Sequence, residues 1–68
     1  MTEDEVTEIL AALGEVPEQI RSLELAWLIS EVEQRYRVTL ELGDADLAAM
    51  RTVPGAAATL RHLLGKIR

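Results

Sequence analysis

Apolar residues recur every three or four positions in the first part of the chain, which predicts an amphipathic helix over about residues 2–13. Its buried stripe is expected to consist of Val6, Ile9, Leu10 and Leu13. Thr2 is the expected N-cap, because its oxygen can accept a hydrogen bond from an unpaired N–H of the first turn. Gly14 is expected to end the helix. Val16 and Ile20, in the short connection that follows, are expected to pack against the core.

A second amphipathic helix is predicted from Ser22 to about Tyr36. At about 100° per residue, its core face carries Leu25, Leu28, Ile29, Val32 and Tyr36. Trp27 falls about 200° from Leu25 on the same helical wheel. Four residues lie near it, namely Leu23, Ser30, Glu31 and Gln34. The only tryptophan is therefore expected to point away from the core.

The segment of residues 37–42 alternates like a short strand, but no other part of the chain offers a strand to pair with it. We therefore expect an extended connector, anchored by some of its apolar residues, Val38, Leu40 and Leu42. A short helix is predicted to follow from Asp44 to about Met50. Leu47 and Met50 are expected to face inward from it.

The last helix is predicted to start after Thr52, its N-cap, and to extend to about Ile67. Pro54 is compatible with the first turn because its missing N–H has no helical partner there. The inward positions are expected to be Ala57, Leu60, Leu63, Leu64 and Ile67. The expected fold is therefore all-α. It is a single domain over residues 1–68, built as a bundle of three main helices plus one short helix.

The composition narrows the range of functions. The 68 residues include 12 acidic and 7 basic side chains, for a net charge of −5. This balance disfavours nucleic-acid binding, which needs cations to replace phosphate counterions, and favours partners with basic docking surfaces. With no cysteine, one histidine and no obvious acid pair, neither a metal site nor a catalytic site is expected. The acidic N-terminus and the absence of a long apolar run predict a soluble, cytoplasmic protein without a membrane partner, which we expect to be monomeric.

Ser22 is the candidate functional residue, and two interpretations of it are compatible. It could be an N-cap, whose hydroxyl accepts a backbone hydrogen bond and stabilises the helix by about 1 kcal/mol. Glu24 in the first turn supports a cap, although Leu25 stands where a capping box would place Glu or Gln. Ser22 could also be a site of covalent phosphate attachment, because a helix start presents unpaired N–H groups and partial positive charge.

A family resemblance bears on this choice. From Ser22 onward, Ser-Leu-Glu-Leu, then Leu-Ile, then Glu-Val-Glu-Gln-Arg-Tyr, resembles the second helix of acyl and peptidyl carrier proteins. Residues 44–47, Asp-Ala-Asp-Leu, are similar to the acidic short helix of that family. Residues 51–53, Arg-Thr-Val, are similar to its Thr-Val junction before the last helix.

The resemblance implies a four-helix carrier fold in which Ser22 bears a covalent 4′-phosphopantetheine arm. A separate phosphopantetheinyl transferase would supply the arm from coenzyme A, and its thiol would carry an acyl, aminoacyl or polyketide chain as a thioester. The partners implied are the acyl-loading and acyl-processing enzymes of fatty acid, polyketide or nonribosomal peptide biosynthesis. In that family the second helix is the face that partner enzymes recognise. The docking residues implied here are Leu23, Trp27, Ser30, Glu31 and Gln34.

Two features depart from the family pattern. Arg21 stands where the family usually has an Asp before the serine, and residues 14–21 replace a longer first loop. Both favour an alternative of another class, a carrier-like interaction module that has lost the arm and binds a partner through Leu23 and Trp27. A third hypothesis is an unrelated helical bundle with similar patterning. Met1 favours a free-standing chain over one excised from a larger synthase.

Overall fold

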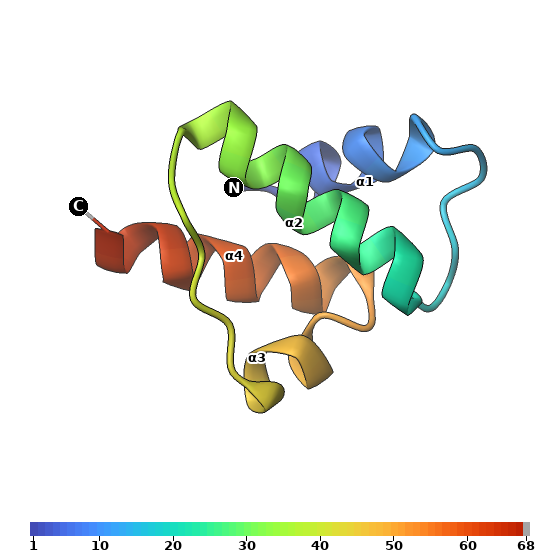
Figure 1. The fold of residues 1–68 in the computed structure, drawn as a ribbon. Coiled ribbons are helices and arrows are strands. Elements are labelled where there is room, and N and C mark those ends of the chain that lie inside the picture. The colour runs from blue at the N-terminus through green and yellow to red at the C-terminus, as the bar shows by residue number, and fades with distance from the viewer. Residues whose placement is uncertain (68) are drawn as a thin grey trace.

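Four helices make up the regular structure of residues 1–67, which the computed structural model describes, with side chains described for residues 1–66. They are α1 (Glu3–Ala11), α2 (Ser22–Tyr36), α3 (Asp44–Ala49) and α4 (Val53–Ile67) (Figure 1). No strand occurs among the described residues, so the predicted all-α bundle of three main helices and one short helix is confirmed. Helix α1 packs against α2 and α4, and α3 packs against α4.

The helix starts follow the predicted capping chemistry at two places. The Glu5 N–H donates to the Thr2 hydroxyl at 3.3 Å at the start of α1. The Gly55 N–H donates to the Thr52 hydroxyl at 3.2 Å at the start of α4. Each bond pairs one of the N–H groups that a helix leaves unpaired at its start.

Helix α1 is shorter than its apolar pattern predicts. It ends at Ala11, and bonds between residues three apart, such as Leu13 N–H to Leu10 C=O at 3.0 Å, tighten the chain into a turn. Gly14 completes this turn with a φ of +135°, which an L side chain rarely adopts. Leu13 therefore leaves the helical register and is 48% exposed, so its prediction as a core residue is wrong.

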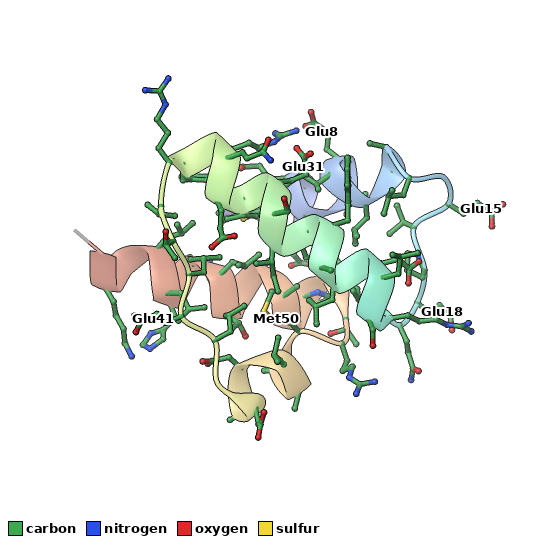
Figure 2. The ribbon with its side chains drawn as sticks, viewed as in Figure 1. Glu8, Glu15, Glu18, Glu31, Glu41 and Met50 are labelled. Atoms are coloured by element: carbon green, nitrogen blue, oxygen red, sulfur yellow. The ribbon has the colours of Figure 1, made fainter. Side chains whose placement is uncertain are left out.

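The core lies where the three long helices meet. Its buried residues are Val6, Ile9, Leu10, Ile20, Leu25, Leu28, Val32, Leu40, Met50, Ala56, Ala57 and Leu60. Figure 2 shows Met50 in the middle of the bundle, whereas Glu15 and Glu18 project outward from the α1–α2 connection. Ile20 is buried as predicted, but Val16 is exposed, because only the end of this connection reaches the core.

At the C-terminal end of α2, one residue lies outside the core although the helical wheel places it on the core face. Tyr36 was predicted on the core face, but its side chain is 38% exposed and its hydroxyl donates to Glu5 at 2.7 Å. The phenol oxygen needs a polar partner, and the carboxylate on α1 provides one outside the core. That hydrogen bond, with partial burial, raises the pKa of Tyr36 above its ordinary value of 10.0.

The segment between α2 and α3 is an extended connector, as predicted. Leu40 is buried in it, and Val38 and Leu42 are partly buried against the core. The Glu33 carboxylate accepts a hydrogen bond from the Leu40 N–H at 2.8 Å, which pairs a backbone group that has no strand partner. The connector thus fixes where α3 begins.

The turn from α3 into α4 is unusually close. A Cβ on Gly55 would collide with the carbonyl oxygen of Ala49, so only glycine fits at this position. Met50 is buried and Leu47 partly buried, as predicted. Ala57 and Leu60 are buried and Leu63 and Leu64 partly buried on α4, while the predicted inward side chain of Ile67 lies outside the described residues.

Candidate functional site at the start of helix α2

Ser22 is exposed and is the first residue of α2. The N-cap position belongs to Arg21, whose backbone is extended with φ −90° and ψ 172°. The Glu24 carboxylate accepts a hydrogen bond from the Arg21 N–H at 2.9 Å, and the Arg21 carbonyl accepts one from Leu25 N–H at 2.8 Å. The N-cap interpretation of Ser22 is therefore wrong, because Ser22 is already the first helical residue and the helix begins one residue earlier than that interpretation requires.

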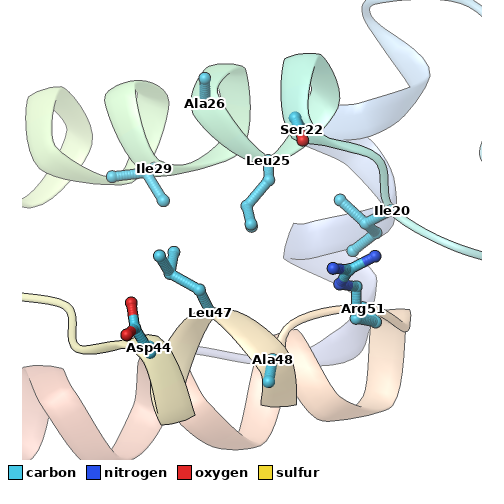
Figure 3. Close-up of a pocket in the computed structure, with 9 residues that line it drawn as sticks. All are labelled: Ile20, Ser22, Leu25, Ala26, Ile29, Asp44, Leu47, Ala48 and Arg51. Carbon is cyan, nitrogen blue, oxygen red and sulfur yellow. The ribbon is translucent and has the colours of Figure 1, made fainter.

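A cavity of about 450 Å³ lies beside Ser22, between α2 and α3 (Figure 3). Helix α2 contributes Ser22, Leu25, Ala26 and Ile29, and the other wall contains Ile20, Asp44, Leu47, Ala48 and Arg51. Most of these side chains are aliphatic, and the polar groups stand at the ends. This volume and lining are within the range of small-ligand sites.

A backbone hydrogen bond between distant parts of the chain holds this cavity together. The Ile20 N–H donates to the Arg51 carbonyl at 2.6 Å. The Ile20 side chain is buried, so the segment before α2 is fixed both by packing and by this bond. Because Ser22 is two residues after Ile20, the bond places Ser22 next to the turn between α3 and α4.

Charge is unevenly distributed around the cavity. Figure 3 shows Ser22, Ile20 and Arg51 at one end and Asp44 toward the other, at the start of α3. Arg21, the residue before Ser22, does not line this cavity. The residues at the Ser22 end therefore fit a phosphate group, since an exposed hydroxyl stands at the positive end of a 15-residue helix and shares the cavity with the Arg51 side chain.

Of the predicted docking residues, Leu23, Ser30 and Gln34 are exposed on α2 and Glu31 is partly buried. Leu23 is the most exposed large apolar side chain that the structure describes, at 82%. These four residues remain candidates for a docking surface.

Trp27 does not point into solvent, so its predicted orientation is wrong. Its indole Nε1–H donates to the Ile9 carbonyl on α1 at 3.1 Å, and the ring is partly buried against the core. The helical wheel of α2 placed it correctly opposite Leu25, but α1 covers that side of α2. Trp27 therefore joins two helices.

A second hollow, of about 540 Å³, lies on the other side of the start of α2. We call it the Leu23 groove; it is lined by Leu13, Glu15, Val16, Pro17, Arg21, Leu23 and Glu24. Its three large aliphatic residues, Leu13, Val16 and Leu23, are all exposed. Sequence reasoning missed this groove because it assigned Leu13 and Val16 to the core.

Arg51 was also missed as a site residue. In the sequence it is only the residue before the Thr52 cap, and nothing local relates it to Ser22. The relation arises from the hydrogen bond between Ile20 and Arg51, which joins segments far apart in the chain.

Among the described residues, no group of three or more His, Asp or Glu side chains is arranged to hold a metal ion. Within the same part of the chain, no helix combines the length and the apolar character that crossing a bilayer requires. Comparisons with protein-family models, with curated proteins and with solved structures give no match for this chain.

Proposed function

We propose that this chain is a carrier protein, not an enzyme, that bears a 4′-phosphopantetheine arm on Ser22. One observation carries the proposal: the hydroxyl of Ser22 is exposed at the first residue of a long helix and stands at the edge of an aliphatic cavity. An exposed position lets a transferase reach the oxygen, and the adjoining positive charges favour the phosphodiester that would result.

The attachment reaction balances with coenzyme A as the donor. The Ser22 oxygen forms the new bond to phosphorus, adenosine 3′,5′-bisphosphate leaves as its pyrophosphate bond breaks, and the hydroxyl proton passes to a base of the transferase. When bound, the arm supplies a terminal thiol that holds an acyl, aminoacyl or polyketide intermediate as a thioester.

The chain's own residues would present the arm without taking part in the chemistry of the cargo. Leu25, Ile29 and Leu47 offer an apolar surface beside the attachment point. Contact with this surface would remove apolar groups of the arm or of a short cargo from water. Release to a partner enzyme remains possible because the cavity is open to solvent at its edge.

Partner enzymes with basic docking surfaces suit the charge of this chain. Its net charge of −5 accelerates encounters with cationic surfaces. Leu23 would supply apolar contact area, with Ser30, Glu31 and Gln34 further along the helix. Trp27 is not part of this surface, because its ring is used between α1 and α2.

Intact-protein mass spectrometry after incubation with coenzyme A and a broad-specificity transferase tests the proposal. The wild type is expected to gain the mass of one phosphopantetheinyl group, and Ser22→Ala to gain none. Ser30→Ala, an exposed serine on the same helix, is the matched control and should be modified like the wild type. Ser22→Ala should keep its fold, with a change in stability below about 0.5 kcal/mol, because Ser22 is not the cap.

A second candidate function is an interaction module without the arm. The Leu23 groove favours it, because three exposed aliphatic residues meet there next to Arg21, which replaces the acid usual before a carrier serine. This candidate predicts an unmodified wild type and a partner whose binding is lost in Leu23→Lys but kept in Ser22→Ala. The carrier hypothesis predicts modification of the wild type.

A further inference from the structure

We propose that the Arg51 guanidinium binds the phosphate attached to the Ser22 oxygen and so directs the arm into the cavity between α2 and α3. This inference rests on the proposed function and adds to it a specific phosphate-binding residue and a direction for the arm. It starts from the observation that Ser22 and Arg51 line the same cavity although they lie in different elements.

The backbone fixes where the Arg51 side chain starts. The Arg51 carbonyl accepts the Ile20 N–H at 2.6 Å, so its Cα is held beside the segment that leads into α2. Figure 3 shows the Arg51 side chain beside Ile20, on the Ser22 side of the cavity. A phosphate on the Ser22 oxygen would extend from the helix start into this space.

The charged groups around Ser22 favour Arg51 over Arg21 for this contact. Arg51 lines the cavity between α2 and α3, whereas Arg21 lines the Leu23 groove on the opposite side. The nearby acids are Glu24, whose carboxylate accepts the Arg21 N–H, and Asp44, which stands toward the far end of the cavity. A guanidinium can hold two phosphate oxygens at once, which makes it a directional contact.

The arginine that binds the phosphate decides which of the two hollows the arm enters. Binding of the phosphate by Arg51 would place the first bonds of the arm over Leu25 and Leu47. Binding by Arg21 would place them over Leu13 and Leu23 instead. Arg51 therefore decides which apolar surface the arm contacts.

Phosphoserine incorporated at position 22 tests the contact without any transferase. The probe is the phosphate on that residue, whose second ionisation has a pKa near 6 and is followed by ³¹P NMR. A cation within a few ångströms favours the dianion. We expect Arg51→Gln to raise this pKa by about half a pH unit, and added salt to diminish the difference.

Arg21→Gln is the matched control, since it removes another exposed arginine, adjacent to the same residue. It is expected to change the phosphate pKa by less than half as much as Arg51→Gln. Arg51→Lys is expected to retain most of the wild-type value because it keeps the charge. All three variants should fold, since the structural hydrogen bond of Arg51 uses its backbone carbonyl.

Equal phosphate pKa values in the wild type and in Arg51→Gln would overturn the inference, and so would equal effects of the two arginine substitutions. A lysine variant that behaves like the glutamine variant would also count against it. These outcomes are separate from failure of the carrier function, which is read from the mass of the unmodified chain. A chain that accepts no arm but shows the expected titration loses the carrier function and keeps the phosphate contact.

Discussion

The two hollows beside the start of α2 differ in how their walls are held. The wall of the cavity between α2 and α3 includes two buried residues, Ile20 and Leu25, and the hydrogen bond between Ile20 and Arg51 fixes one end of it. The Leu23 groove is bordered by the turn after α1, whose apolar side chains are exposed. A supported cavity keeps its shape when nothing occupies it, whereas exposed apolar groups gain most when a partner covers them. Under the proposed function, the arm would occupy the cavity and a partner would cover the groove.

The largest difference is expected when one leucine in each hollow is truncated to alanine. Leu25 is 9% exposed and lines the cavity, whereas Leu23, on the same helix, is 82% exposed and lines the groove. Leu25→Ala should lower the free energy of unfolding by about 2–3 kcal/mol, because buried methyl groups are lost and a void remains. Leu23→Ala should change it by less than about 0.5 kcal/mol. Urea denaturation measures both, and equal losses would contradict the comparison.

A second test shifts α3, which forms one wall of the cavity, through the close approach of Gly55 to Ala49. Gly55→Ala would bring a Cβ onto the Ala49 carbonyl, so α3 has to shift at a cost of about 1–3 kcal/mol. Gly65→Ala is the matched control on α4, because a Cβ there meets nothing within 4 Å. It should be neutral or stabilise the helix by up to about 1 kcal/mol.

Amide chemical shifts locate the change that Gly55→Ala produces. The amides of Leu47 and Ala48 in the cavity wall should move, while those of Leu13 and Val16 in the groove should not. Shifts spread evenly over both hollows would show that the two are not independent.

A third test concerns the hydrogen bond by which Trp27 joins α2 to α1. Trp27→Phe removes the bond to the Ile9 carbonyl and should lower stability by about 1 kcal/mol. In the wild type, tryptophan emission should be shifted to the blue and only partly quenched by iodide, because the ring is partly buried. Red, easily quenched emission would contradict the packing of Trp27 between α1 and α2.

The smallest effect is expected at the hydrogen bond between Tyr36 on α2 and Glu5 on α1. Tyr36 has a pKa raised by its hydrogen bond to Glu5, so the stabilisation is present below pH 10 and is lost as the pH rises through the higher, folded-state value. The wild type should therefore lose slightly more stability than Tyr36→Phe in alkaline solution. Denaturation midpoints at pH 8 and about pH 11 compare them, and parallel losses would contradict the contact.

The helices and most of the core follow from the sequence because their signals are local. Apolar spacing predicted the extent of α2, and the threonines before α1 and α4 predicted their caps. Ser22 was predicted as the first helical residue, but its capping role failed because the Arg21 backbone adopts the cap conformation.

The errors at Trp27 and Arg51 arise where a distant element decides the outcome. A helical wheel gives the direction of Trp27 but cannot show that α1 lies there. The error at Leu13 is local, because apolar spacing does not show that α1 ends at Ala11. Arg51 belongs to the site only through a hydrogen bond to Ile20, about thirty positions away. Ser22 was therefore predictable as a candidate, whereas its surroundings depend on the tertiary structure.

The most direct measurement of the central claim is the intact mass of the protein after exposure to coenzyme A and a phosphopantetheinyl transferase. The account predicts a single added phosphopantetheinyl group on the wild type and on Ser30→Ala, and none on Ser22→Ala. An unchanged wild-type mass, under conditions in which the same transferase modifies a known carrier protein, would contradict it.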